Sequence, residues 1–505
     1  FARLETIIPR ARAGSYNTNR ELKVALQTAI LAAAKEAKIN LAEQNAQTEQ
    51  YLTRVGVADA IYALQANANA VGWYDKTVTK ALKVLGKIHP EINTDPNAKF
   101  AFTWALAVTS NGLKVDKNFE LAEQAYRAYK NTGRMPSNIE AGQAQGAINK
   151  SLDLFNQMVA QYGIDNVRKF MDSKFAVSQI KRATGLEVTG EFAETLVRGA
   201  AVLGPKIGNG FYANLNGFFD QLTMDRWLMR TWGRWTGTLI EARPDMVKLK
   251  RQELRDFVVQ MKQNAPAAAE FQKALGAKLT VGDLDGLAKT IQKASMDPDT
   301  RQLFNKTPAG EGLRLSGNSL AKYLDGQKEA PDGPKERNFI RKVFSQILKE
   351  VQKEHPALTM SDLQALLWYP EKRLYDIAKS DESANQEEGY SDDEAPDYAN
   401  AASKLARDLG VSDADIQSAG AEAEKDYASR ISAGTTGRGT VGQATPGTAP
   451  AARGFAERES REFLTTGVVR GIRSAGTSDA GQPNSYTRKS GGDGKGLRVL
   501  NLPSV

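Results

Sequence analysis

The stretch Gly204-Pro205-Lys206-Ile207-Gly208-Asn209-Gly210 and the stretch Thr223-Met224-Asp225-Arg226-Trp227 decide the fold, since each joins a polar turn to a helical segment. Glycine permits positive φ in a tight turn, and residues 207–215 repeat apolar side chains at helical spacing. Lys206 is therefore expected in the first turn of a helix, where the helix dipole and partial burial both disfavour an ammonium. A lysine in that position loses its proton more readily and can attack carbon as an amine.

Asp225 follows Lys206 by nineteen residues and begins the next helical segment. The spacing predicts a catalytic pair in which the amine of Lys206 faces the carboxylate of Asp225. A simpler interpretation also fits the local sequence: Asp225 or Thr223 caps the helix, and Lys206 is a solvated surface lysine. Both interpretations stay open at the level of sequence.

The composition narrows the chemistry that the chain can perform. Its 505 residues contain no cysteine and only two histidines, His89 and His355, each followed by proline. Disulfides, thiol nucleophiles, iron–sulfur clusters and cysteine zinc sites are thereby excluded, and neither a metal site nor a Ser-His-Asp triad is expected. Lysine, carboxylate, serine and tyrosine are the reactive groups left, and no cofactor is expected.

Charge and hydropathy suggest what the chain binds. No run of about 18 apolar residues occurs, so no membrane span is expected, and no signal-peptide pattern opens the chain. The start at Phe1 indicates a processed product or a piece of a longer polypeptide. A formal net charge of +8 favours a polyanionic partner, nucleic acid above all, although such a charge is also ordinary for a protein of this length.

Apolar residues recur at three- and four-residue spacing through residues 1–380, which predicts an almost entirely helical, all-α protein. The segments with this spacing are Leu22–Lys38, Ala58–Ala66, Phe100–Val108, Ala122–Tyr129, Leu152–Tyr162, Phe192–Val202, Leu254–Met261 and Phe339–Val351. The stretch Trp368-Tyr369-Pro370-Glu371 is expected at a helix end, where the proline ends the helix and Trp368 packs against the main body. Glu371 has no partner visible in the sequence.

The composition changes near residue 380. Residues 381–397 hold eight acidic side chains and no basic one, which is typical of a solvated linker. A short helix is expected at Ala401–Asp408, and the Gly-, Ser-, Thr- and Ala-rich sequence from Ala433 predicts a disordered C-terminal tail. Residues 431–505 carry ten basic and five acidic residues, a net of +5, so nucleic-acid binding and simple solvation are both open for the tail.

The stretch from Gly204 to Arg230 resembles the helix-hairpin-helix DNA glycosylases. In that family a hairpin with the pattern Leu-Pro-Gly-x-Gly-x-Lys precedes a helix, and an aspartate follows at the spacing seen here. Gly204 matches the second hairpin glycine, Lys206 the Schiff-base nucleophile of bifunctional members, and Asp225 the aspartate. The Val-Asp-x-x-x-x-Arg around the family's aspartate corresponds to Met224-Asp225-Arg226-Trp227-Leu228-Met229-Arg230.

A second stretch resembles the same family's early helix and the turn after it. Ala105-Leu106-Ala107-Val108-Thr109-Ser110-Asn111-Gly112, followed by Val115-Asp116-Lys117-Asn118, matches an apolar run, a small-Ser-polar turn and a Val-x-x-Asn helix start. Asn111 corresponds to the residue that family members insert into the duplex where the base has left. Asn111 and Lys206 are 95 residues apart, so the two motifs occur in the family's order with room for one modest insertion.

The resemblance covers roughly residues 95–240 and implies a DNA-acting protein that flips a base into a pocket. Asp225 would assist departure of the base, and Lys206 would attack the sugar C1′ to form a Schiff base. Tyr212 and Trp227 are expected beside the flipped base, although core packing is the commoner role of aromatics. The expected DNA contacts are Asn111, Gly204, Gly208, Lys114, Arg226 and Arg230, with a solvated face as the alternative for the basic residues.

The hairpin departs from the family pattern at two positions. Val202 stands where the family has its first glycine, and Ala201 where it has a proline. That glycine lets backbone amides approach a DNA phosphate, and Pro205 removes a further amide. Phosphate binding by this hairpin therefore follows less directly from the resemblance than the fold does.

A different function class fits the remaining features. The segments Gly204–Trp232 and Asp362–Pro370 also resemble helical parts of very large multi-domain phage proteins, which are often virion-associated. The alternative function is thus a catalytically silent virion or DNA-ejection protein that binds DNA or partner subunits. Either function locates the protein in the cytoplasm of an infected bacterial host or in a phage particle.

Four consecutive regions are expected along the chain. An N-terminal helical region (1–92) precedes a helix-hairpin-helix glycosylase-like core (93–245). A C-terminal helical region (246–380) follows, and the acidic linker with its low-complexity tail (381–505) completes the chain.

Overall fold

Apolar side chains at helical spacing produce helices along almost the whole chain. The computed structural model describes residues 2–16, 18–66, 72–111, 113, 115–141, 145–375 and 398–432. Within these ranges the only strands are β1 (Lys174–Ala176) and β2 (Leu196–Arg198), an antiparallel pair with Phe175 opposite Val197. The predicted all-α class is therefore confirmed. Within the same ranges no helix combines the length and apolarity needed to cross a membrane.

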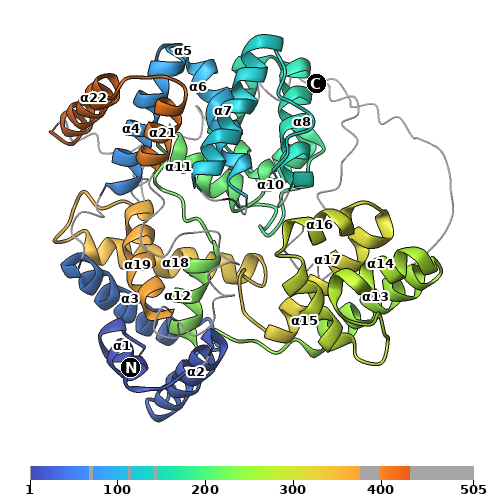
Figure 1. Ribbon diagram of the computed structural model, residues 1–505. Helices are drawn as coiled ribbons and strands as arrows, with labels where there is room; N and C mark the ends of the chain where they lie inside the picture. The colour runs from blue at the N-terminus through green and yellow to red at the C-terminus, as the bar shows by residue number, and fades with distance from the viewer. Residues whose placement is uncertain are drawn as a thin grey trace, which may run out of the picture.

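The first core surrounds α6 (Pro96–Thr109), which is buried along almost its whole length. A helix that is apolar all round belongs at the centre of a bundle rather than on its surface. Its Phe100 and Trp104 rings pack against each other and against Phe155. The helices around it are α4 (Trp73–Ile88), α5 (Glu91–Thr94), α7 (Val115–Thr132), α8 (Gln145–Tyr162), α9 (Ile164–Asp172), α10 (Val177–Thr184), α21 (Tyr398–Asp408) and α22 (Asp413–Ser432). They occupy the upper part of Figure 1.

The second core is assembled from three separate stretches of the chain. Its helices are α1 (Leu4–Ala13), α2 (Asn19–Glu36), α3 (Ala46–Ala66), α12 (Arg226–Thr236), α18 (Pro334–Val351) and α19 (Met360–Tyr375). Every residue of α12 after Arg226 is buried. Trp232 and Trp235 of α12 pack against Phe339 and Phe344 of α18, with ring centroids 5.9 and 5.3 Å apart. The helix α12 is thus the centre of this core.

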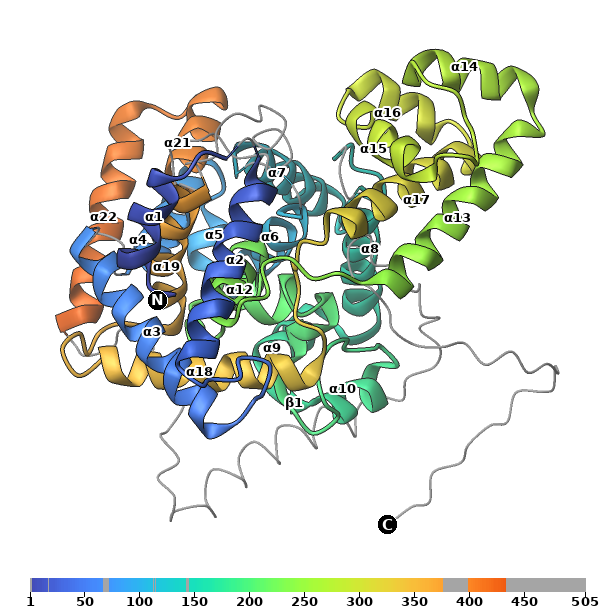
Figure 2. The ribbon, with the colours of Figure 1, turned by 90° about the horizontal axis from the view of Figure 1, so that it is seen from below.

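The third core forms a separate lobe, which lies at the right of Figure 1 and projects from the rest of the molecule in Figure 2. Its helices are α13 (Pro244–Lys262), α14 (Ala265–Leu275), α15 (Leu284–Ala294), α16 (Pro298–Asn305) and α17 (Pro308–Asp325). The chain enters and leaves through one neck, where Ile240 bridges Gln327 and the Glu241 amide donates to the Gly326 carbonyl at 2.7 Å. The lobe is therefore an insertion between α12 and α18.

These cores group the chain differently from the four consecutive ranges predicted above. The first core takes residues between 78 and 215 and resumes at Tyr398, whereas the second core takes residues from 2–64, 222–239 and 339–375. Sequence neighbours in the range 93–245 thus belong to two cores. The reason is that packing partners are chosen across the whole chain, and composition reports only local breaks.

Helices α21 and α22 lie inside the range 381–505 that was predicted as linker and tail. Tyr398 packs against Phe119 and Phe211, with ring centroids 5.9 and 5.7 Å apart, and Lys83 pairs with Asp426 at 2.9 Å. The predicted short helix at Ala401–Asp408 is confirmed as part of α21. The remainder of that predicted range, residues 381–397 and 433–505, lies outside the described residues.

The segment Phe192–Val202 is not the α-helix that its spacing predicts. It contains β2 and the 3₁₀ helix η2 (Gly199–Leu203). Its backbone hydrogen bonds go to a neighbouring segment, because the Gly199 amide donates to the Ser173 carbonyl at 2.9 Å. Gly199 also lies so close to Phe170 that a Cβ would be 2.2 Å from the Phe170 carbonyl oxygen. Tertiary pairing therefore overrides the helical spacing here.

Pro370 lies inside α19 and does not end it, contrary to the prediction. Glu371, the next residue, is completely buried and accepts hydrogen bonds from Arg234. Trp368 packs against Trp227 of the main body as expected, with ring centroids 6.1 Å apart. A partner in another helix thus holds the last turn of α19 in place despite the proline, which removes one helical hydrogen bond.

Arg234 of α12 is completely buried and joins four parts of the second core. Its guanidinium donates to Glu371 of α19 at 2.6 and 2.9 Å and pairs with Asp59 of α3 at 2.8 Å. It also donates to the Ala2 carbonyl, and Asp59 accepts the Leu4 amide at 2.8 Å. Although burial acts to lower the pKa of Arg234, Asp59 and Glu371 hold it above its usual range.

Replacing Arg234 by Met is expected to lower the free energy of unfolding by about 3–5 kcal/mol, because two buried carboxylates lose their cation. Arg20→Met is the control, since Arg20 is half-exposed and pairs with Asp325 at 3.7 Å. That exposed pair should contribute less than about 1 kcal/mol. Urea unfolding followed by circular dichroism measures both. Equal losses in the two variants would contradict a central role for Arg234.

Candidate functional site

The hairpin around Lys206 requires glycine at two positions, one on each side of the lysine, and for different reasons. Gly204 joins η2 to the π-helix η3 (Ile207–Tyr212) at φ +97°, a backbone conformation that favours glycine. Gly208 lies against η2 so closely that a Cβ would be 1.6 Å from the Ala200 carbonyl oxygen. The Gly208 amide donates to the Gly204 carbonyl at 2.9 Å, which closes the turn. Single π-helical turns are rare and often occur at functional sites.

An extended segment runs back along η3 and brings Asp225 toward Lys206. The chain reverses after α11 (Ala213–Leu215) at Gly217, whose φ is +82°. On the way back Thr223 lies against Gly210, where a Cβ would be 2.6 Å from the Thr223 hydroxyl. Gln364 of α19 fixes this segment, because it accepts the Thr223 amide at 2.8 Å and donates to the Thr223 carbonyl at 2.7 Å. A turn and an extended return segment thus explain the nineteen-residue spacing.

The structure brings the two members of the predicted pair near each other. Lys206 is exposed at the start of η3, and Asp225 is half-buried at the N-terminus of α12. Burial raises the pKa of the Asp225 carboxyl, whereas the Lys206 ammonium and the Leu228 amide act to lower it. The Lys206 charge thus acts on Asp225, although no salt bridge joins the two among the described residues. The exposure of Lys206 differs from the partial burial expected from the sequence.

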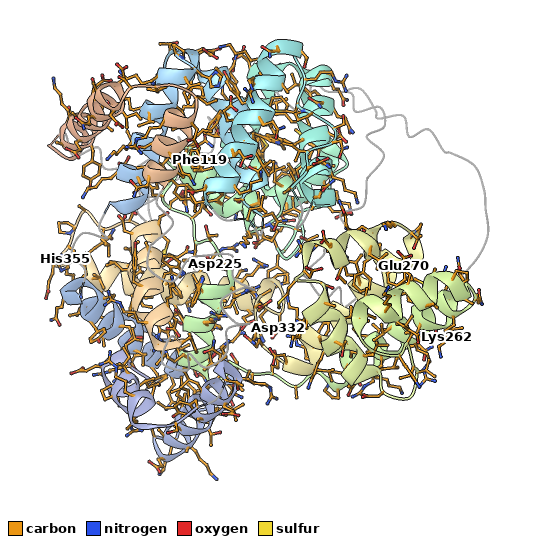
Figure 3. The ribbon with its side chains drawn as sticks, in the orientation of Figure 1. Phe119, Asp225, Lys262, Glu270, Asp332 and His355 are labelled. Atoms are coloured by element: carbon orange, nitrogen blue, oxygen red, sulfur yellow. The ribbon has the colours of Figure 1, made fainter. Side chains whose placement is uncertain are left out.

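Asp225 also caps a helix, as the simpler interpretation proposed. Its carboxylate accepts the Leu228 amide of the first turn of α12 at 2.8 Å. Figure 3 shows Asp225 near the middle of the molecule, where the first-core and second-core helices meet. Lys206 belongs to the hairpin of the first core and Asp225 to the second, so the pair spans their junction.

The cavity beside Asp225 is small. It has a volume of about 10 Å³, enough for about one water molecule. Its lining residues are Asp225, Trp227, Leu228, Thr231, Phe344, Gln364, Leu367 and Trp368. Ligand pockets usually measure about 300–1,000 Å³, so this cavity does not hold a nucleobase in the present conformation.

The two aromatics predicted to flank a flipped base do not share a pocket. Tyr212 is completely buried in the first core, where its hydroxyl donates to Asp172 at 3.2 Å and its ring packs against Phe100. Trp227 belongs to the second core and lines the cavity beside Asp225. Tyr212 is therefore a core residue, because its ring and its hydroxyl both have partners inside the protein.

The two arginines predicted to contact DNA interact within the protein. Arg226 pairs with Glu329 at 2.9 Å. Burial acts to raise the pKa of Glu329, but Arg226 and Lys322 lower it to about 2. Arg230 is buried, with its guanidinium 4.3 Å from the ring centroid of Trp227. The charge of each arginine is thus partly neutralised or screened inside the protein.

The second motif forms the predicted turn but lies away from Lys206. The Thr109 hydroxyl donates to the Asn118 side chain at 2.6 Å and so joins the end of α6 to α7. Asn111 is half-buried in the turn between them, and Lys114 lies outside the described residues. Phe100 and Thr103 of α6 contact Tyr212 and Asn216 in that order. The helix α6 and residues 212–216 therefore run in the same direction. Lys206 precedes the first of these contacts and Asn111 follows the last, so the two residues lie toward opposite ends.

Two residues that support the site carry no local sequence signal. Ser361 donates to the Asn214 side chain at 2.8 Å, and Gln364 holds Thr223 as described above. Both lie on α19, about 140 residues after the hairpin that they support. Only a knowledge of which helices pack together would have identified them.

Comparisons with protein-family models, with curated proteins and with solved structures found no match. The functional assignment therefore rests on the residues and geometry of this chain.

Asp225→Ala is expected to lower the free energy of unfolding by about 1 kcal/mol, because α12 loses its N-cap. Asp225→Asn should change it by only a few tenths of a kcal/mol, since asparagine caps equally well. Thermal or urea unfolding measures both variants. Equal losses would show that the carboxylate charge, and not the cap, stabilises this position.

Asp172 gives a pH dependence of stability with a defined sign. Burial raises the pKa of its carboxyl to about 6, against the lowering effects of Tyr212 and Arg198. The folded state thus holds the proton more tightly than the unfolded state, so the contribution is present below about pH 4 and lost as pH rises through 6. Between pH 4 and 7 the free energy of unfolding of the wild type should fall by up to about 3 kcal/mol relative to that of Asp172→Asn. Urea unfolding across this range tests it, and parallel profiles would contradict it.

Proposed function

We propose that the protein acts on DNA as a base-excision glycosylase or abasic-site lyase, with Lys206 as the nucleophile. The observation that carries this proposal is the junction of the two cores, where an exposed amine acts on a carboxyl whose pKa burial has raised. Schiff-base chemistry needs an amine as the nucleophile and a nearby acid that can give and take a proton. The match of Gly204, Lys206 and Asp225 to the hairpin pattern supports the choice of DNA as substrate.

The geometry favours the lyase step over base removal. In the lyase step the Lys206 amine attacks the C1′ aldehyde of a ring-opened abasic sugar. The C1′–N bond forms, and water leaves with a proton that Asp225 can supply. The C2′ proton then passes to the ionised Asp225, the C3′–O bond breaks, and the strand leaves with the phosphate that C3′ carried. An abasic sugar needs no base pocket, whereas base excision would require the water-sized cavity at Asp225 to open.

The second candidate is the non-catalytic virion or DNA-ejection protein. It is favoured by the internal partners of the predicted site residues, since Asp225 caps α12 and Arg226 pairs with Glu329. In that function the hairpin and α12 only hold the two cores together. DNA binding would then depend on salt but not on Lys206.

Borohydride trapping on DNA with a single abasic site tests the lyase. The wild type should form a covalent adduct, seen as a shifted band after denaturing electrophoresis, because borohydride reduces the Schiff base. Lys206→Arg should lose the adduct by at least a hundredfold while keeping the positive charge. Asp225→Asn should slow its formation about a hundredfold or more, consistent with the usual contribution of general acid–base catalysis.

Lys181→Ala is the control, since Lys181 is an exposed lysine of the neighbouring α10 and pairs with Glu187. It should trap DNA as the wild type does. Adducts that survive Lys206→Arg, or no adduct with any variant, would overturn the lyase. Salt-dependent DNA binding in the same samples would then favour the second candidate.

A further inference from the structure

Arg337 of α18 is a buried arginine that forms no salt bridge within the described residues. It is 3% exposed, its Nη1 contacts the Met224 Sδ at 3.7 Å, and its Nε has no hydrogen-bond partner among the described residues. The other buried arginines of the described residues each have an acidic or aromatic partner: Arg198, Arg230 and Arg234. Burial lowers the pKa of Arg337. An unpaired buried cation is strongly destabilising, so an anion has a physical reason to bind here.

One carboxylate faces two guanidinium groups at this position. Glu191 is buried, and both its oxygens accept hydrogen bonds from Arg341, which lies one turn after Arg337 on the same face of α18. Among the neighbouring carboxylates, Glu191 also acts most strongly on the charge of Arg337. Gly190 covers the guanidinium so closely that a Cβ would be 2.7 Å from Arg337 Nε. Arg337, Arg341 and Glu191 together carry one positive charge in excess, and Glu336, the other carboxylate that acts on Arg337, pairs with Lys328 at 2.9 Å.

The segment that carries Glu191 has few other attachments. From Leu186 to Gly190 no backbone amide donates to another backbone carbonyl of the described residues. Val188 is its buried apolar anchor, whereas Phe192 and Leu196 just after it are 49% and 67% exposed. Segments with few buried contacts and few backbone hydrogen bonds open at low free energy. Release of Glu191 would therefore uncover both arginines without unfolding a helix.

We propose that Arg337 and Arg341 form a phosphate-binding pair that Glu191 occupies in the free protein. A carboxylate brings one negative charge, whereas a phosphate group brings up to two and offers more acceptor oxygens. Planar guanidinium groups bind such oxygens two at a time. A phosphate could thus pair with both arginines, where Glu191 hydrogen-bonds to only one of them.

The phosphate site lies beside the proposed catalytic pair but is independent of it. Arg337 contacts Met224, the residue before Asp225, and the Glu191 segment continues through β2 and η2 to Lys206. A phosphodiester of bound DNA could fill it with one negative charge, where a phosphomonoester brings up to two. Free phosphate and a terminal phosphomonoester share the same chemistry, and the test separates these sources.

Glu191→Gln is expected to bind inorganic phosphate at least tenfold more tightly than the wild type, measured by isothermal titration calorimetry at constant ionic strength. The neutral amide of this variant no longer competes as an anion, so both guanidinium groups are free for the ligand. Adding Arg337→Met should abolish the gain. Anisotropy with a short fluorescent single strand, with and without a 5′ phosphate, distinguishes phosphodiester from phosphomonoester binding.

Asp285→Asn is the matched control, because Asp285 accepts two hydrogen bonds from Arg251 on the third-core lobe, where the pair is exposed. It frees one arginine in the same way and should gain no phosphate affinity. Near-UV circular dichroism checks that each variant is folded. Phosphate binding by Glu191→Gln no tighter than wild type, or binding that survives Arg337→Met, would overturn the proposal. Lys206→Arg should keep phosphate binding, so failure of the lyase leaves this test intact.

Discussion

The buried guanidinium of Arg234 is the constraint on which the second core depends. It hydrogen-bonds to Glu371, pairs with Asp59 and donates to the Ala2 carbonyl, so one cation fixes α12 against α19, α3 and the N-terminal segment. A charge buried to this degree is costly unless ion pairs and hydrogen bonds offset its desolvation. The position of α12 is therefore specified more narrowly than apolar packing alone would require. Because Asp225 is the N-cap of α12, fixing the helix also fixes the place of the candidate carboxylate.

The candidate site arises where this fixed helix meets the glycine hairpin of the first core. Gly208 allows the hairpin helix to approach η2, and Gly217 allows the chain to turn back. Ser361 then attaches α11, and Gln364 the returning segment, to α19, which belongs to the second core. The separation of Lys206 and Asp225 is thus a property of the contact between two cores and not of either one alone. A shift of one core against the other would change the Lys206–Asp225 separation, whereas the water-sized cavity is lined only by second-core helices and would keep its lining.

The sequence predicts what is local and misses what depends on distant partners. Helical spacing, the N-cap at Asp225 and the turn at Gly204 follow from neighbouring residues, and the structure has all three. Pro370 was expected to end a helix, but Glu371 has its partner 137 residues away in α12. Phe192–Val202 has helical spacing, yet its amides bond across to the region of β1. Tyr212 is the kind of side chain that stacks on a base. Only the position of Asp172 shows that the Tyr212 hydroxyl already donates a hydrogen bond inside the protein.

Two buried arginines of the second-core helices, Arg234 and Arg337, differ in whether the protein supplies their anionic partners. Arg234 has salt bridges to two carboxylates, whereas Arg337 has none among the described residues and stays under a loosely attached segment. A protein that needed Arg337 only for packing would be more stable with an apolar side chain there, because removing an unpaired buried charge removes its desolvation penalty. The buried cation therefore argues for an anionic ligand at this position. Its contact with Met224, the residue before Asp225, puts that site next to the candidate carboxylate without making either depend on the other.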